Sequence, residues 1–174
     1  MNHDPQLTLP GVIEPEQTTR IEFTIPHEPV AWPRAGHRIV WPNGAATMIG
    51  RRLMRKTFVS TYAPEGPIRT FKAAAQHSAK AAHWGEPLAG PLKLTALFIF
   101  PRHAGKFWKT KFMPRYLKMT KPDLDNCVKA LKDALTSIVY VDDAQVAVIN
   151  AEAWHASGYE EPHVFVEIET LPQG

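Results

Sequence analysis

Four aspartates and one lysine stand close together in the sequence around a single short helix. Asp123 and Asp125 lie in KPDLDNCVKALKDAL, and Asp142 and Asp143 follow in YVDDAQVAV. Carboxylates are hard oxygen ligands suited to Mg²⁺ or Mn²⁺, and a pair of such ions can stabilise the attacking and leaving oxygens of a phosphodiester. Because three carboxylates are enough to hold such a site, the segment predicts metal-assisted phosphodiester chemistry.

Lys129 follows Asp125 by four residues and is therefore expected one turn further along the same helix. Its ammonium can orient a carboxylate there, or stabilise the negative charge that develops on a phosphoryl group in the transition state. The ordinary alternative is a surface ion pair between the two side chains, worth about 0.3–0.5 kcal/mol.

Each aspartate also has an ordinary structural explanation. Asp is favoured at helix starts, where it caps backbone N–H groups and complements the helix dipole, and Asp-Asp-Ala before a strand is a common turn. Taken singly, each aspartate fits a cap or a turn better than a catalyst, and for Asp142 the two explanations are evenly balanced. The joint arrangement, with two aspartates at each end of one helix beside a basic segment, favours the metal site.

An apolar stripe defines the helix that carries these residues. Its members are spaced four, three, four and three residues apart: Leu124, Val128, Leu131, Leu135 and Ile138. This stripe faces the core and leaves Asp125 and Lys129 on or near the opposite face. Inside a helix, Asp123 and Asp125 would point about 200° apart. Asp123 is therefore expected at or before the first turn, in extended geometry, if the two carboxylates are to converge.

A basic segment precedes this helix. Residues 102–121 contain seven Lys or Arg and no acidic residue, whereas seven acidic residues and no Lys or Arg follow from residue 142 to the end. Cations can neutralise DNA phosphates, and interleaved aromatic side chains can stack on unpaired bases. Packing against the domain itself or a second subunit is an equal alternative for Trp108 and Phe112. The candidate DNA-binding residues are Arg102, Lys106, Lys109, Lys111, Arg115, Lys118 and Lys121.

The remaining periodicity predicts an α+β fold, with a mixed sheet flanked by two main helices. Strands are expected at 20–25, 57–62, 91–100, 145–154 and 163–170. The first helix is expected at 66–84, and Asn43-Gly44 is a hairpin signal between 38–41 and 47–49. The strand 91–100 is apolar on both faces, which predicts that its end is covered on both sides. Residues 1–19 are polar and aperiodic and are expected to form a tail, so the single domain is 20–174.

The composition excludes several classes of protein. With 174 residues and 44% hydrophobic content the chain can bury one sizeable core. Its one cysteine, Cys127, cannot make an intramolecular disulfide, and no run approaches the roughly 18 apolar residues of a membrane span. A cytoplasmic protein without membrane contact is expected. Zinc-ligand spacings, a Walker A loop and a dinucleotide-binding glycine pattern are all absent from the sequence.

The aspartate motif resembles the signature of the RusA family of Holliday-junction resolvases, which is common in phages and prophages. The resemblance joins D-L-D-N, a lysine four residues later, the helix, and D-D-A-Q-V. It implies a homodimeric endonuclease that depends on Mg²⁺, or on Mn²⁺ in its place, and makes paired nicks at four-way DNA junctions in recombination and repair. Carried over by position, the catalytic and metal-binding acids are Asp123, Asp125 and Asp143, and the catalytic lysine is Lys129.

Two other functions are compatible with the same residues. One is a nuclease of the same chemistry that acts on flaps or other branched DNA. The other is a DNA-binding phage module without catalytic activity, in which the aspartates only cap and turn. Metal binding through the aspartates would separate the second from the nucleases.

Overall fold

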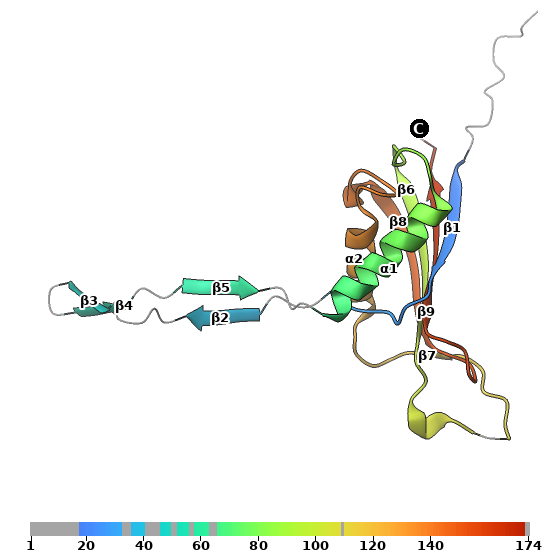
Figure 1. Cartoon of the computed structure of the whole chain (residues 1–174), viewed down its shortest axis with the longest axis horizontal. Helices are drawn as coiled ribbons and strands as arrows, with labels where there is room; N and C mark the ends of the chain where they lie inside the picture. Colours follow the sequence, from blue (N-terminus) through green and yellow to red (C-terminus); the bar gives the residue numbers. More distant parts are fainter. Residues whose placement is uncertain are drawn as a thin grey trace, which may run out of the picture.

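The main body of the protein is a five-stranded mixed sheet with two helices on one face (Figure 1). The computed structural model describes residues 18–32, 66–108 and 110–172 with their side chains, and four strands between 36 and 62 by their backbone. The strand order is β1-β9-β6-β8-β7, and only the central pair β6 and β8 is parallel. The strands of this sheet are β1 (Arg20–Ile25), β6 (Leu92–Phe100), β7 (Tyr116–Leu117), β8 (Val146–His155) and β9 (His163–Thr170). The predicted α+β class is confirmed.

The two helices are α1 (Pro67–Ala82) and α2 (Leu124–Leu135), and they pack against each other and the sheet. In α2 the predicted stripe faces the core, since Val128, Leu131 and Leu135 are buried. Ile138 is packed against the core as well, but it lies beyond the end of the helix. Among the described residues, no helix has both the length and the apolar character needed to cross a membrane.

The two faces of the sheet differ in character. On the helix side, alternate residues of β6 from Leu92 to Phe100 are buried, and near the end of the strand Ile99 is buried on the other side too, as predicted. The far side carries exposed or half-buried ion pairs, such as Arg20 with Glu167 at 2.7 Å. These opposite charges offset each other, so this face has little attraction for a polyanion.

Two further antiparallel ladders lie apart from the five-stranded sheet (Figure 1). Strand β2 (Gly36–Val40) pairs with β5 (Phe58–Tyr62), and β3 (Ala46–Ile49) pairs with β4 (Arg52–Arg55). The predicted hairpin between 38–41 and 47–49 is therefore wrong, although Asn43-Gly44 itself lies outside the described residues. Pro42, two residues beyond the end of β2, has no N–H to donate to a ladder. Only two residues separate β3 from β4, a length that closes a hairpin.

Candidate active site

A pocket of about 560 Å³ lies between α2 and β8 and collects most of the predicted site. Asp125 and Lys129 line it from α2, and Asp143 lines it from the turn that leads into β8. The remaining lining residues are Leu124, Val128, Lys132 and Ile149. The two halves of the sequence motif therefore meet in one hollow. The hollow lies beside the part of β8 that does not pair with β7.

Lys129 does not make the ordinary surface ion pair. In the described part of the chain no carboxylate, Asp125 included, lies within ion-pair distance of its ammonium. Its Nζ instead lies 5.5 Å from the centre of the Trp32 ring. The positive charge of Lys129 therefore stands beside the pocket without a neutralising partner among the described residues.

Asp123 has the geometry expected of it. It occupies the N-cap position of α2 with φ −72° and ψ 142°, which is extended backbone, and its side chain makes no capping hydrogen bond. Its carboxylate is exposed, and it is not one of the residues that line the pocket. The structure thus confirms the local geometry of Asp123 and leaves its approach to Asp125 a prediction.

The two adjacent aspartates have different roles. Asp142 caps the short 3₁₀ helix η2 (Asp143–Gln145): its Oδ1 accepts from the Ala144 N–H at 2.8 Å. Asp143 instead contributes to the pocket, where its Oδ2 lies 3.4 Å from the Lys132 Nζ. The structure thus shows the capping role that was one of the two explanations for Asp142.

Gln145 is a positioning residue that the sequence analysis missed. Its Oε1 accepts from the Asp142 N–H at 2.9 Å, which completes a capping box, and its Nε2 donates to the carbonyls of Leu88 (2.9 Å) and Gly90 (3.1 Å). These bonds tie the turn that carries Asp143 to the segment before β6. The spacing Asp-x-x-Gln is a variant of the capping-box pattern and was the available signal.

Tyr140 fixes the return from α2 to this turn. It is fully buried, and its hydroxyl donates to the Lys132 carbonyl at 3.0 Å. Burial raises the pKa of the Tyr140 phenol far above its usual value, so it remains a neutral donor. Burial likewise raises the pKa of the Cys127 thiol to about 11, as is usual for a cysteine that packs in an apolar core.

The pocket offers donors of the type that Mg²⁺ takes. Carboxylate oxygens suit this ion, which commonly uses one or two carboxylates and keeps several waters. Asp125 and Asp143 meet that need in one pocket. Within the ranges that the structure describes, however, no three His, Cys, Asp or Glu side chains are grouped as around a metal ion. The donor chemistry therefore fits, while a three-aspartate centre remains a prediction.

Two of the seven basic DNA-binding candidates are engaged inside the protein. Arg102 is 8% exposed, and its guanidinium donates to the carbonyls of Ala156 (2.9 Å) and Pro114. Lys118 donates to the carbonyl of Pro122 at 2.8 Å, and burial lowers the pKa of its ammonium. Both side chains brace the segment that precedes α2 rather than present a free charge to solvent.

Arg115 is committed to a single acidic partner. Its Nε lies 3.1 Å from both carboxylate oxygens of Glu160, and its terminal nitrogen donates to the same group. This hydrogen bonding is the main reason that the pKa of Glu160 falls to about 2. Most of the charge of Arg115 is therefore offset within the domain.

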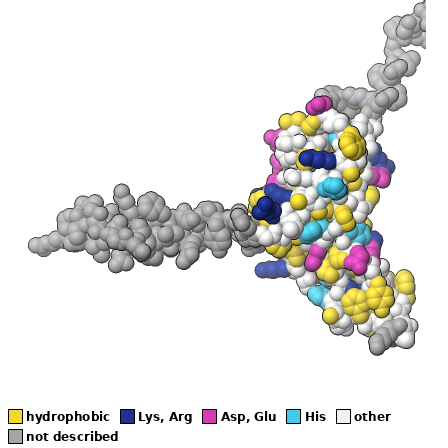
Figure 2. Space-filling model, viewed as in Figure 1, with side chains coloured by type: hydrophobic (Ala, Val, Ile, Leu, Met, Phe, Trp, Pro, Cys, Tyr) yellow, Lys and Arg dark blue, Asp and Glu magenta, His cyan; other side chains and the backbone are white. Residues whose placement is uncertain are grey.

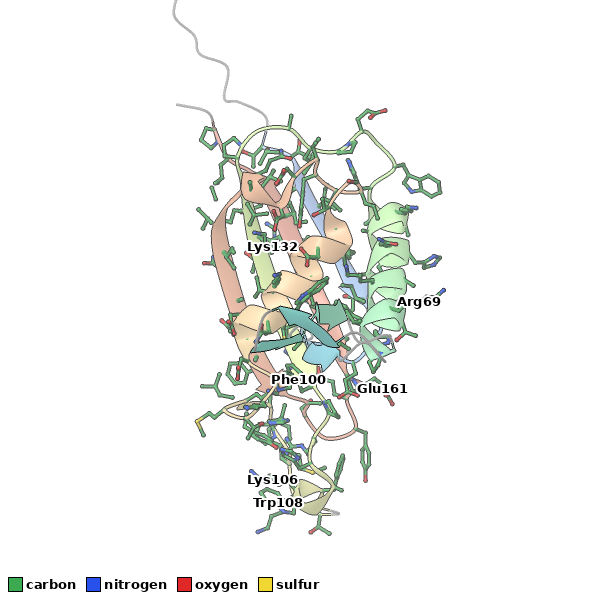
Figure 3. All side chains as sticks on the ribbon, turned by 90° about the vertical axis from the view of Figure 1, so that its left-hand side faces the viewer. Arg69, Phe100, Lys106, Trp108, Lys132 and Glu161 are labelled. Atoms are coloured by element: carbon green, nitrogen blue, oxygen red, sulfur yellow. The ribbon has the colours of Figure 1, made fainter. Side chains whose placement is uncertain are left out.

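The other basic candidates are more accessible. Lys106, Lys111 and Lys121 are exposed, whereas Lys109 lies outside the described residues. Figure 3 places Lys106 and Trp108 at one end of the molecule, far from Lys132 in α2. Hydrophobic side chains gather over this segment in Figure 2. Trp108 and Phe112 are 51% and 86% exposed, so neither is packed into the domain core.

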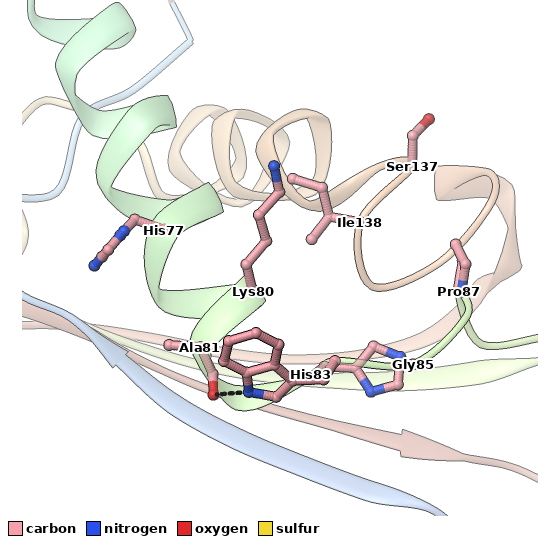
Figure 4. Close-up of a pocket in the computed structure, with 9 residues that line it drawn as sticks. His77, Lys80, Ala81, His83, Gly85, Pro87, Ser137 and Ile138 are labelled. Carbon is pink, nitrogen blue, oxygen red and sulfur yellow. Dashed lines mark hydrogen bonds between the residues drawn. The ribbon is translucent and has the colours of Figure 1, made fainter.

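A second pocket, of about 600 Å³, lies at the C-terminal end of α1 (Figure 4). Its lining includes His77, Lys80, Trp84 and Ile138, and the Trp84 indole N–H donates to the Ala81 carbonyl at 3.0 Å. No carboxylate side chain is among its described lining residues. Its chemistry therefore does not match that of the aspartate motif.

Comparison with known proteins decides the family. A family model described as "Endodeoxyribonuclease RusA" matches residues 44–169, which is well over half of the chain and includes every residue of the pocket. The chain belongs to the RusA family. Asp123, Asp125, Lys129 and Asp143 all fall inside the RusA match.

The chain is also similar to a curated bacterial protein, the "Uncharacterized protein YqaN" of Bacillus subtilis (strain 168). The two are 44% identical over 52 residues, which is 30% of this chain and 34% of that protein. The chain thus spans about a third of the length of this relative. Its printed name describes no activity, so the RusA match alone carries the family assignment.

Proposed function

We propose that this protein is a metal-dependent endonuclease that cuts branched DNA, with the four-way junction as its substrate in recombination and repair. The observation that carries the proposal is the pocket in which Asp125, Asp143 and Lys129 meet, in a chain of the RusA family. The family description names an endodeoxyribonuclease, and carboxylates beside an unneutralised ammonium are suited to phosphodiester hydrolysis.

Asp125 and Asp143, joined by Asp123, would hold Mg²⁺ or Mn²⁺. When bound, the ion would polarise the phosphate and help to generate the attacking water. Lys129 stabilises the negative charge that develops on the phosphoryl oxygens. Lys132 holds the Asp143 carboxylate in the pocket through their contact of 3.4 Å.

The segment before α2 is proposed to bind the DNA outside the pocket. The exposed lysines Lys106, Lys111 and Lys121 would contact phosphates, and the exposed rings of Trp108 and Phe112 would stack on bases that are unpaired at a branch. The two scissile strands of a four-way junction are related by approximate two-fold symmetry, and one compact site cannot reach both. A C2 homodimer is therefore part of the proposal.

The experiment compares a four-way junction, a flap and a plain duplex, each with Mg²⁺ and with EDTA. We expect Mg²⁺-dependent cleavage of the junction, no cleavage in EDTA, and little cleavage of the duplex. A plasmid that extrudes a cruciform separates the assembly states, because a homodimer that nicks both strands in one binding event yields linear product. Preferential cutting of the flap would assign the alternative branched-DNA nuclease, and equal binding without cleavage of any substrate would contradict the nuclease proposal.

Gln145→Ala is expected to lower the cleavage rate by about 10–100-fold, although Gln145 is not itself a proposed metal ligand. The substitution removes the bonds that hold the turn of Asp143 against the carbonyls of Leu88 and Gly90. It should also lower the free energy of unfolding by about 1–3 kcal/mol. Single-turnover cleavage and urea denaturation measure the two effects.

Gln145→Glu is the matched control for this prediction. Glutamate keeps oxygen acceptors for the Asp142 N–H but cannot donate to the two carbonyls. Both variants should therefore lose activity if the link to the segment before β6 positions Asp143. Parental cleavage by a destabilised Gln145→Ala protein would show that the link serves stability alone.

A further inference from the structure

Trp32 brings a second lysine close to the candidate active site. It lies in the segment after β1, and its backbone N–H donates to the Asn126 carbonyl in α2 at 2.8 Å. The Nζ of Lys72, from α1, lies 4.4 Å from the centre of the Trp32 ring, and that of Lys129 lies 5.5 Å from the same centre. Three separate elements thus place two ammoniums around one indole ring.

The two ammoniums form a positively charged site. Neither has a carboxylate partner within ion-pair distance among the described residues, and the attraction of each to the ring face is the interaction that the structure gives it. Like charges held around one ring repel each other, and a bound anion would remove that repulsion. Lys129 also lines the carboxylate pocket, so such an anion would lie next to the reacting centre.

We propose that Lys72, Lys129 and Trp32 form a phosphate subsite. It holds the backbone phosphate next to the scissile phosphate, on the DNA strand that is cut. The proposal rests on the proposed function and adds to it the path of the strand, from the pocket between α2 and β8 towards the N-terminal half of α1. Trp32 orients the two ammoniums through its ring, and its backbone bond to Asn126 fixes it relative to α2.

The first test measures DNA binding in EDTA as a function of salt, for the parental protein, Lys72→Ala and Lys80→Ala. Lys80 is the matched control, because it is an exposed lysine on the same helix that lines the other pocket. If Lys72 contacts a phosphate, its removal should weaken junction binding and lower the slope of log K against log salt by about 0.9. Lys72→Arg should restore the slope, and Lys80→Ala should leave it unchanged.

A second test locates the phosphate. Replacing junction phosphates one at a time by neutral methylphosphonates should reveal one position, next to the cut, at which the loss weakens the parental protein but not Lys72→Ala. Equal slopes for the two alanine variants would overturn the subsite, as would a phosphate scan in which Lys72→Ala loses affinity at every position where the parental protein does.

The outcomes distinguish this subsite from the proposed function. Binding in EDTA requires no cleavage, so a salt-slope effect of Lys72 in a protein that cuts no branched DNA would preserve the subsite and contradict the nuclease. Cleavage of junctions by a Lys72→Ala protein with a parental salt slope would support the nuclease and overturn the subsite. A parental protein that binds no DNA would overturn both.

Discussion

Replacing Asp143 by asparagine is expected to lower Mg²⁺-dependent cleavage of junctions by at least about a hundredfold, because the site loses a charged ligand where charge develops. Asparagine keeps the size of the side chain but removes its negative charge. Junction binding without metal should hold or tighten, since a source of repulsion towards phosphate is gone. The structure adds a second reason. Lys132 Nζ lies 3.4 Å from the Asp143 carboxylate, and without that negative charge its own positive charge would be free to attract phosphate.

Asp142→Asn is the internal control for this prediction. Asp142 caps η2 by accepting from the Ala144 N–H, and asparagine is as good an N-cap as aspartate. Its cleavage rate should therefore remain near that of the parental protein. Single-turnover cleavage and binding in EDTA measure the two responses. Parental cleavage by a folded Asp143→Asn protein would remove Asp143 from the metal site, and a stable variant that binds no junction would make it a recognition residue.

Replacing Lys129 by methionine should lower the single-turnover cleavage rate at saturating DNA by about 10²–10³-fold. Methionine retains an unbranched chain that can lie against Trp32 but has no charge to stabilise the phosphoryl oxygens. Lys129→Arg keeps a positive charge with a different shape and should retain part of the activity.

The readout separates chemistry from binding. At saturating DNA, a lysine that only binds phosphate would affect the affinity and leave the rate of the bound complex unchanged. Lys80→Met, on α1 and outside the carboxylate pocket, should cleave at the parental rate. An unchanged single-turnover rate for Lys129→Met, with a reduced salt slope, would confine Lys129 to the phosphate subsite.

The parts of the fold that follow from local periodicity could be predicted from the sequence. The spacing of Val128, Leu131 and Leu135 predicted which face of α2 is buried, and hence that Asp125 and Lys129 lie away from the core. The position of Asp123 before the first turn followed from helix geometry together with the expectation that its carboxylate converges with that of Asp125. Such features depend on neighbours within one or two turns, which the sequence displays directly.

The parts that depend on distant partners could not be predicted in this way. Nothing near Trp32 in the sequence indicates that it meets Lys129, almost a hundred residues later, because the contact forms where the segment after β1 lies against α2. All seven basic residues of the segment before α2 were candidates for DNA binding, yet Arg102 is buried against backbone carbonyls and Arg115 pairs with Glu160. The density of charged residues in a sequence does not show which of them become buried or paired in the folded protein.

Titration with Mn²⁺ in the presence of a noncleavable junction shows whether Asp125 and Asp143 bind a metal ion. We expect the parental protein and Asp142→Asn to bind the ion equally well, and Asp125→Asn and Asp143→Asn to bind it at least about tenfold more weakly. Electron paramagnetic resonance of the free ion measures each affinity without requiring cleavage. Equal Mn²⁺ affinity in the parental and Asp143→Asn proteins, or no binding by the parental complex, would contradict the assignment of this pocket as a metal-dependent nuclease site.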